Sequence, residues 1–209
     1  MSATQRLYLL LVLAVVIERA VELVITRRNL AWARARGARE HGAGHYPWMV
    51  ATHGFFLVAC PLEVVALDRQ FVPLLGAPML GLVAAAMALR YWAIAALGRR
   101  WTTRVVVLPE LPVVTGGPYR WLRHPNYLAV VIEVAALPLV HTAWITAVVF
   151  SAANALVLRR RIAAEETALR AASDYDAAMA GRRALLPRAA ADPDGRRRGG
   201  GSRALRERP

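Results

Sequence analysis

The apolar stretch YLAVVIEVAALPLVHTAWITAVVFSAANALVL, residues 127–158, decides how the chain folds. As one helix its 32 residues would extend about 48 Å at 1.5 Å per residue, whereas the hydrocarbon core of a bilayer is about 30 Å thick. Pro138 and His141 lie near its middle. We therefore predict a tight helical hairpin with the arms Tyr127–Val140 and Ala143–Leu158, both slightly short for a full crossing.

Three further apolar stretches precede this hairpin. Leu7–Ile25 is followed by no small-residue cleavage site, so we expect a retained span and not a signal peptide. Trp48–Leu67 and Val72–Leu97 are separated by a short polar loop. Together the stretches predict an all-α fold, an integral membrane bundle of about five transmembrane helices whose last two form a hairpin.

The composition agrees with a membrane protein. Hydrophobic residues make up 57% of the 209 residues, more than the 45–50% typical of soluble domains, yet the net charge is +13. The single cysteine, Cys60, excludes a disulfide framework and a cysteine-based metal site. His41, His45 and His124 do not have the spacing of metal ligands, so we expect no metal site.

The positions of the arginines predict the orientation. Five of the 27 basic residues lie in Arg27–Pro47, five in Gly98–Asn126 and thirteen from Arg159 onward. The positive-inside rule then places the N-terminus outside and the C-terminus in the cytoplasm. The arginine- and glycine-rich tail 188–209 is predicted to be disordered and to attract anionic lipid headgroups, and no nucleic-acid partner is expected.

Several charged side chains fall inside the predicted spans, where each is costly. They are Glu18, Glu22, Glu63, Arg90 and Glu133. One interpretation is an internal ion pair of Arg90 with Glu133 or Glu22 that holds helices in register. The other is that these side chains line a polar pocket. Both interpretations also apply to His53 in the second span and to His45 in the loop before it.

The segment LGRRWTTRVVVLPELPVVTGGPYRWLRHPNYLAVVIE, residues 97–133, contains a loop too long to be a simple connection. Pro125 suits the first turn of the following helix, which places His124 at the helix N-terminus, where free N–H groups favour an anion. The loop also contains Trp101, Tyr119 and several arginines. These residues predict a cytoplasmic site for a planar, partly anionic ligand.

A second cluster follows the last span. One helical stripe leaves the membrane there, formed by Asn154, Leu158, Arg161, Glu165 and Leu169. Considered alone, the cluster is explained more simply as a basic collar followed by an i,i+4 pair of Arg161 with Glu165.

Taken together, GPYRWLRHPNYL from Gly117 and RIAAEETAL from Arg161 resemble the isoprenylcysteine carboxyl methyltransferase family of integral membrane enzymes. The similarity covers about residues 97–187, and the first half looks like bacterial members, some of which act on lipid-like phenols or pyrones. The chain departs from the family pattern after the glutamate pair, where Tyr175 stands without the usual Phe-Gly, and at Ala129, where a glycine is common. Because of these departures, the resemblance does not predict which residues form the outer wall of the pocket.

The resemblance implies O-methyl transfer from S-adenosylmethionine, bound in a cytoplasmic cofactor pocket, to a lipophilic small-molecule or prenylated acceptor. The cofactor-binding residues it implies are Gly117, Pro118, Tyr119, His124, Pro125, Tyr127, Glu165 and Glu166. Candidates near the acceptor are Arg123, Glu133, His53 and Arg90. If the acceptor is a phenol or enol and not a carboxylate, His53 and His124 are the candidate bases. The implied organisation is three helices in 1–97, the catalytic part in 98–187 and the tail from 188.

Three alternatives remain at this stage, of which a transporter is the least favoured because the sequence shows no inverted repeat. The RHP-x-Y element followed by a glutamate also resembles membrane sterol reductases, which use NADPH. A non-enzymatic lipid-binding protein would explain the arginines but not the long aromatic loop. The sequence leaves the acceptor and the oligomeric state open.

The orientation is testable with a C-terminal reporter that is active only outside the cytoplasm. We expect no signal from it, because the C-terminal segment from Arg159 onward contains thirteen arginines and should stay in the cytoplasm. A reporter of opposite specificity is the control. A strong outside signal would contradict the five-span topology.

Overall fold

The computed structural model describes residues 1–41, 44, 46–108 and 111–185; His45 and the tail 188–209 therefore lie outside the described residues. Within that part, the helices are α1 (Ala3–Arg34), α2 (Tyr46–Ala66), α3 (Pro73–Leu97), α4 (Pro125–Leu139), α5 (Trp144–Ala172) and the short α6 (Tyr175–Ala178). Two short strands are β1 (Arg39–His41) and β2 (Val105–Val107). Two 3-10 turns are η2 (Gly98–Arg100) and η3 (Gly117–Arg120). The predicted all-helical character is confirmed apart from the strands.

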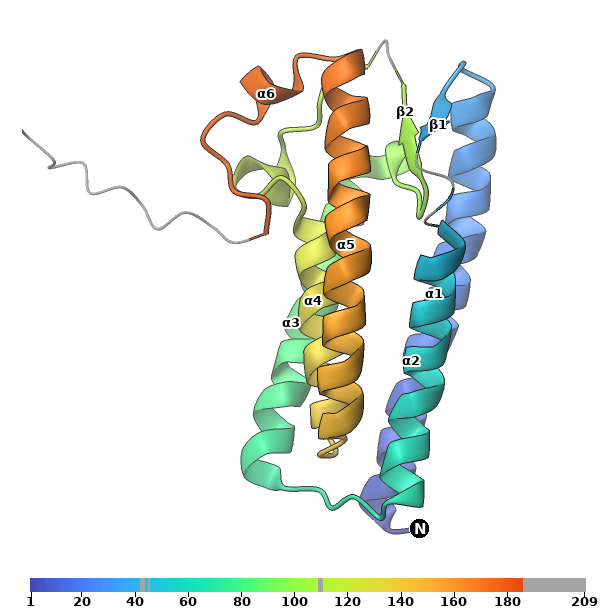
Figure 1. Ribbon diagram of the computed structural model, residues 1–209, viewed down its shortest axis with the longest axis vertical. Coiled ribbons are helices and arrows are strands. Elements are labelled where there is room, and N and C mark those ends of the chain that lie inside the picture. The colour runs from blue at the N-terminus through green and yellow to red at the C-terminus, as the bar shows by residue number, and fades with distance from the viewer. Residues whose placement is uncertain (42–43, 45, 109–110, 186–209) are drawn as a thin grey trace, which may run out of the picture.

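The five long helices form an elongated bundle (Figure 1). Helix α4 packs against both α3 and α5, and α2 packs mainly against α5 and α1. The N-terminus lies at the end of the bundle opposite to the two strands (Figure 1). The apolar core between the helices includes Tyr8, Phe56, Val64 and Leu137.

The predicted hairpin turn is confirmed, whereas the second arm is longer than predicted, since α5 has 29 residues and continues to Ala172. Helix α4 ends at Leu139 and α5 begins at Trp144. The turn is closed by Glu63 of α2, whose carboxylate accepts hydrogen bonds from the backbone N–H groups of Ile145 at 3.2 Å and Thr146 at 2.7 Å. These N–H groups have no partner within a helix, so Glu63 replaces the N-cap side chain that α5 lacks.

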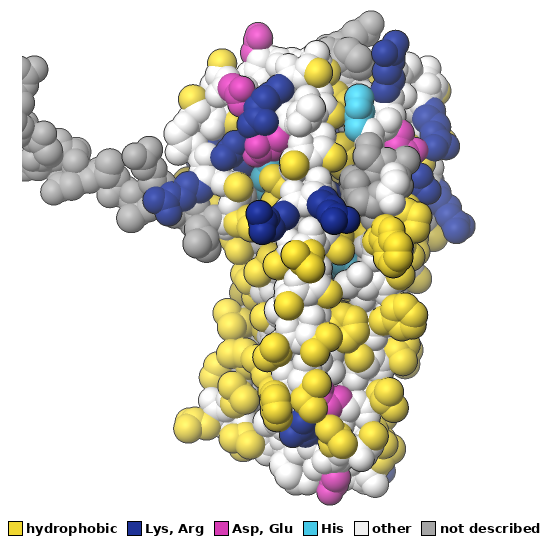
Figure 2. All heavy atoms as spheres, viewed as in Figure 1, with side chains coloured by type: hydrophobic (Ala, Val, Ile, Leu, Met, Phe, Trp, Pro, Cys, Tyr) yellow, Lys and Arg dark blue, Asp and Glu magenta, His cyan; other side chains and the backbone are white. Residues whose placement is uncertain are grey.

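The surface of the bundle is that of a membrane protein. Two helices are long and apolar enough to cross a bilayer, Tyr46–Ala66 and Pro73–Arg100, and only 22% of the most apolar window of each is buried. A core helix of a soluble protein would be mostly buried. In Figure 2, hydrophobic side chains cover the long middle part of the bundle, which we call the shaft. Charged side chains gather toward its ends. Because α4 has only 15 residues, a count of five crossings stays a prediction.

The arginine-rich segments meet at one end of the bundle. There β1 pairs with β2 in antiparallel register, with Arg39 opposite Val107, and α5 packs against β2 (Figure 1). The loop after α1, the loop after α3 and the end of α5 are thereby joined. We call this the polar end; which side of the membrane it faces stays a prediction.

Except for Glu63, which pairs with Arg69 at 2.8 Å, the charged side chains predicted inside the spans form one cluster. Arg90 of α3 pairs with Glu133 of α4 and lies 3.5 Å from Glu22 of α1. Arg19 pairs with Glu22 at 2.8 Å and with Glu18 at 2.6 Å. The predicted ion pair of Arg90 is therefore confirmed, and it includes both of its expected partners.

Gly76 allows α3 to approach the hairpin turn closely. A Cβ at this position would lie 2.3 Å from Phe71 Cε2 and 2.6 Å from the Val140 carbonyl oxygen, whereas one at Gly81 would meet nothing within 4 Å. We expect Gly76→Ala to destabilise the protein by about 1–3 kcal/mol through overpacking. Thermal unfolding in detergent should show a lower midpoint for Gly76→Ala than for the wild type. The midpoint of Gly81→Ala should not be lowered. Equal midpoints would contradict this packing.

Candidate functional site

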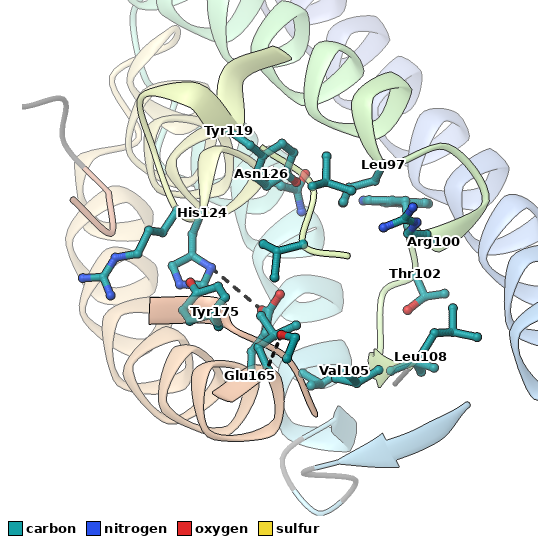
Figure 3. A pocket seen from close by; sticks show the side chains of 18 of the residues that line it. Leu97, Arg100, Thr102, Val105, Leu108, Tyr119, His124, Asn126, Glu165 and Tyr175 are labelled. Carbon is teal, nitrogen blue, oxygen red and sulfur yellow. Dashed lines mark hydrogen bonds and ion pairs between the residues drawn. The ribbon is translucent and has the colours of Figure 1, made fainter. Parts of the chain in front are cut away.

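A cavity of about 150 Å³ opens at the polar end (Figure 3). The loop around β2 forms one side, η3 and the start of α4 form a second, and the last turns of α5 with α6 form a third. Its polar lining residues include Arg123, His124, Asn126, Tyr119, Glu165 and Tyr175. We call it the polar cavity.

The start of α4 is fixed by its sequence. Pro125 occupies the first helical turn, and His124 precedes it with φ −132° and ψ 63°, outside the helical region that a following proline disfavours. The backbone N–H of His124 donates to the Ala184 carbonyl at 3.0 Å, and that of Arg123 donates to the Arg183 carbonyl at 2.9 Å. The chain that follows α6 thus returns to hold the RHP element in place.

Glu166 is the centre of a charged group beside this element. Its carboxylate accepts from His124 Nε2 at 3.2 Å and lies 2.9 Å from Arg123 Nη1 and 2.8 Å from Arg170 Nη2. Burial alone would raise the pKa of Glu166, but the hydrogen bond from His124 and the charge of Arg123 hold this pKa below its ordinary value. Glu166 is therefore ionised at neutral pH, and His124 carries its proton on Nε2 in this arrangement.

Glu165, the other member of the pair, belongs to a different network. The Tyr127 hydroxyl donates to Glu165 and accepts from Arg161 Nε at 2.7 Å. The Arg161 guanidinium also lies over the Tyr127 ring, 5.3 Å from its centroid, and the His124 ring stacks on the Tyr127 ring with the two centroids 5.2 Å apart. The expected direct pair of Arg161 with Glu165 is thus replaced by a chain of hydrogen bonds through Tyr127.

A second cavity of about 250 Å³ lies deeper, between the long helices. Leu57, Val130 and Val157 contribute apolar surface from three helices. Arg19, Glu22 and Arg90 of the buried charge cluster also reach it, so both interpretations of these residues hold together. We call it the membrane cavity.

The two cavities share one wall. The residues that line both are Trp101, Thr102, Asn126, Tyr127 and Arg161. Of these, Trp101 and Tyr127 are 3% and 7% exposed and Arg161 is buried as well, whereas Thr102 and Asn126 are half-buried. A ligand in one cavity and a ligand in the other would therefore approach each other at these side chains, where little bulk water reaches.

The polar cavity offers polar atoms that lack partners. Among the described residues, Trp101 Nε1, Arg123 Nε, Asn126 Oδ1 and the Tyr175 hydroxyl are buried without a hydrogen bond. Burial raises the pKa of Tyr175, so its hydroxyl keeps its proton at neutral pH and can donate. Buried polar groups of this kind are normally satisfied, so these four atoms are available to hydrogen-bond a ligand or water in the polar cavity.

The structure distributes the predicted site residues over three places. Tyr119, His124, Tyr127, Glu165 and Arg123 line the polar cavity, and His53 and Arg90 line the membrane cavity. The remaining predicted residues line neither cavity. They are Gly117, Pro118, Pro125, Glu133 and Glu166. Gly117 illustrates why: its φ is +57°, and a Cβ there would lie 2.9 Å from Ala96 Cβ, so it serves close packing.

Other lining residues were not predicted as part of the site. Arg161 was noted only in the helical stripe, although it borders both cavities. Tyr175 and Met179 pack on Tyr119 and supply the outer wall that the sequence left open. Strand β2 was also missed, although the run Val105–Val107 is a signal for a strand.

Comparisons with known proteins agree on one family. Residues 79–171 match the isoprenylcysteine carboxyl methyltransferase (ICMT) family. The chain is 36% identical to the uncharacterized protein YpbQ of Bacillus subtilis (strain 168) over 78% of its own length and 96% of that protein. It is 29% identical to an uncharacterized protein of Haemophilus influenzae, over 72% of its length and 88% of that protein. No solved structure matches the chain significantly.

The lowered pKa of Glu166 predicts a pH dependence of stability. A carboxylate with a depressed folded-state pKa stabilises the fold above its unfolded pKa, near about 4.3, and this contribution is lost as the pH falls through the folded value. We expect the melting midpoint of the wild type to exceed that of Glu166→Gln at pH 7. The difference should shrink below about pH 4. A difference independent of pH would contradict this assignment.

Proposed function

Since the chain belongs to the isoprenylcysteine carboxyl methyltransferase family, we propose that it is a membrane-embedded O-methyltransferase that uses S-adenosylmethionine and a lipophilic acceptor. The observation that carries this proposal is the pair of cavities with a common wall. One cavity is polar and opens at the arginine-rich end, and the other lies among membrane-facing helices. A polar donor from the water and a lipid-like acceptor from the bilayer can therefore reach the same side chains.

The polar cavity is the proposed donor site. Its unpartnered groups suit a molecule that carries an amino acid, a ribose and a base. Glu165 would accept hydrogen bonds from the ribose hydroxyls or the amino group, and Arg123 would bind the carboxylate. Tyr119 contributes an aromatic surface. When bound, the donor supplies a methyl group on a positively charged sulfur, which is electrophilic without further activation.

The membrane cavity is the proposed acceptor site. Its apolar lining from α2, α4 and α5 suits an alkyl or prenyl chain, which would enter from the bilayer. The head of the acceptor would then lie at the common wall, near Asn126, Tyr127 and Arg161. At the level of the family the acceptor is either an isoprenylcysteine-type carboxylate or a lipid-like phenol or enol.

The contribution of the protein is alignment. Holding two reactants at the right distance and angle removes much of the free-energy barrier to transfer, and no covalent catalyst is needed. Tyr127 is suited to this task because its hydroxyl is held from both sides, by Arg161 and by Glu165. The wall can thus keep one geometry while the cavities fill in turn.

The proposed orientation places the donor site in the cytoplasm. The arginines of the polar end would then face the cytoplasmic leaflet, whose anionic headgroups attract them by about 1 kcal/mol per residue near the surface. Anionic lipid is therefore a proposed partner of the protein together with its acceptor. The proposal includes no nucleic-acid partner.

Donor binding tests this assignment. Glu165→Gln should weaken S-adenosylmethionine binding ten- to a hundredfold, because hydrogen bonds to a charged group contribute about 1.5–3 kcal/mol. The matched control is Asp174→Asn, which removes an exposed carboxylate at the same end of the molecule that does not cap α6. Calorimetry on purified protein measures both affinities.

Transfer of a labelled methyl group in membranes, with prenylcysteine and alkyl-phenol acceptors offered side by side, tests the reaction. Binding of NADPH in place of S-adenosylmethionine would contradict the proposal and favour a reductase. Normal donor affinity in both Glu165→Gln and His124→Ala would return these residues to a structural role.

A further inference from the structure

We propose, building on the function proposed above, that the membrane cavity opens sideways into the bilayer between α1 and α2, and that Gly54 at this opening determines which acceptor tails bind. The acceptor would carry a hydrocarbon tail that is longer than the cavity and leaves it beside Gly54. Three observations carry this inference: the exposure of the lining residues, the length of the cavity, and a glycine that the fold does not require.

The exposed residues of the cavity lining lie together. Of all the residues that line the membrane cavity, only Leu23, Val50 and Gly54 are exposed, and the others are buried or half-buried. Leu23 belongs to α1, whereas Val50 and Gly54 belong to α2. The cavity therefore reaches the surface between these two helices. We call the three residues the lateral opening.

The lateral opening faces the bilayer. It lies on a helix of which only 22% of the most apolar window is buried, so the surroundings of this surface are lipid. Leu23 and Val50 are apolar and 42% and 49% exposed, and Gly54 has no side chain. A polar group that passed here would lose its hydrogen bonds to water and gain none. The chemistry of the opening thus fits an alkyl or prenyl chain.

Helices α1 and α2 are closed against each other farther from the polar end. There Gln5 Nε2 of α1 donates to Asp68 Oδ1 beyond α2 at 2.9 Å. Tyr8 of α1 and Cys60 of α2 belong to one apolar core. The opening is therefore limited to the part of the two helices that lies toward the polar end.

The cavity is shorter than a long lipid tail. Met49 Sδ lies 3.0 Å from Arg161 Nη1, so Met49 marks the level of the common wall on α2. Leu57 is the lining residue of α2 farthest from that wall, about 12 Å along the helix axis. Beyond it, Cys60 and Val64 are 0% exposed and packed in the core. A longer tail must therefore turn out through the lateral opening, which lies between these two levels.

Gly54 is not explained by the fold. A glycine inside a helix destabilises it relative to alanine. Gly76 and Gly117 are needed because a Cβ would clash there. Gly54 does not have a positive φ, and a Cβ at this position would meet no atom of the described residues within 4 Å. The glycine therefore leaves space that the protein itself does not fill.

That space lies where a tail would pass. Val50, Gly54 and Leu57 follow one another at i, i+4 and i+7 and so share one face of α2, the face that lines the cavity. Side chains on a helix lean toward its N-terminus, so a leucine at position 54 would lean toward Val50 and across the opening. Gly54 thus acts on the tail and touches no reacting atom, which makes it a specificity-determining residue.

The first test compares tail lengths in methyl transfer by the full chain in phosphatidylcholine vesicles. The acceptors are 4-alkylphenols and N-acetyl-S-alkylcysteines, each with a butyl tail, which ends inside the cavity, and a hexadecyl tail, which extends beyond it. Within one acceptor class, the ratio of kcat/KM for the long tail to that for the short tail cancels the effect of the head. We expect Gly54→Leu to lower this ratio about tenfold or more through overpacking at the opening.

Gly81→Leu is the matched control. Gly81 is also exposed on a helix long and apolar enough to cross the bilayer, and a Cβ there would meet no described atom within 4 Å. It lines neither cavity. Its long-to-short ratio should therefore equal that of the wild type.

The second test needs no reaction. Hexadecanol with a photoreactive diazirine at its middle carbon is activated in the same vesicles, and the labelled residues are mapped. Labelling of Asn154 and Leu158, which are 3% and 6% exposed, reports a chain inside the cavity, and labelling of Val148, 65% exposed on the same helix, reports bulk lipid. We expect Gly54→Leu to lose most of the labelling at Asn154 and Leu158 and to keep that at Val148. An unchanged thermal midpoint shows that the variant is folded.

The outcomes are distinct. A wild-type ratio of long-tail to short-tail transfer in Gly54→Leu, or wild-type labelling at Asn154 and Leu158, would overturn the inference and leave the methyltransferase function standing. A dimer that dissociates in Gly54→Leu while this ratio is unchanged would overturn it too and assign Gly54 to an interface between two copies. If the wild type transferred no methyl group but the labelling pattern held, the proposed function would fall and the lateral opening would stand.

Discussion

A bilayer provides no water for a charged side chain, and the pairing of the charges inside the shaft is the constraint on which this structure depends. Arg19 and Arg90 are each held by carboxylates from another part of the bundle, and the ion pairs join α1 to α3 and α4. Removing one partner would leave the other charge buried, which typically costs about 3–5 kcal/mol. The cluster therefore fixes the helices at the level where the membrane cavity lies.

The pairing also explains why charged side chains can line part of the otherwise apolar membrane cavity. An unpaired charge would be costly in such surroundings. Here each guanidinium group of the cluster lies against a carboxylate, so Arg19, Glu22 and Arg90 can line the cavity as paired groups. Structure and chemistry thus use the same residues, which is why neither interpretation of the sequence alone was sufficient.

Part of this arrangement follows from local sequence. The hairpin could be predicted because residues 127–158 are too long for one crossing, and the place of His124 because Pro125 fits a first helical turn. The partners of Arg90 could be predicted because few opposite charges lie at membrane depth. By contrast, Glu63 acts on a helix 82 residues away, and β1 pairs with a strand about 66 residues later. No local pattern specifies such contacts, because they depend on how the helices are placed together.

The motif residues divide by physical role in a way that spacing does not reveal. Gly117 and Pro125 determine the path of the backbone and stand behind the polar cavity, whereas His124 and Glu165 present polar atoms to it. The adjacent Glu165 and Glu166 also differ, because successive residues on a helix point in different directions. Glu166 holds the RHP element, and Glu165 reaches the common wall through Tyr127. A glutamate pair therefore connects the fold of the donor site to the place where the two cavities meet.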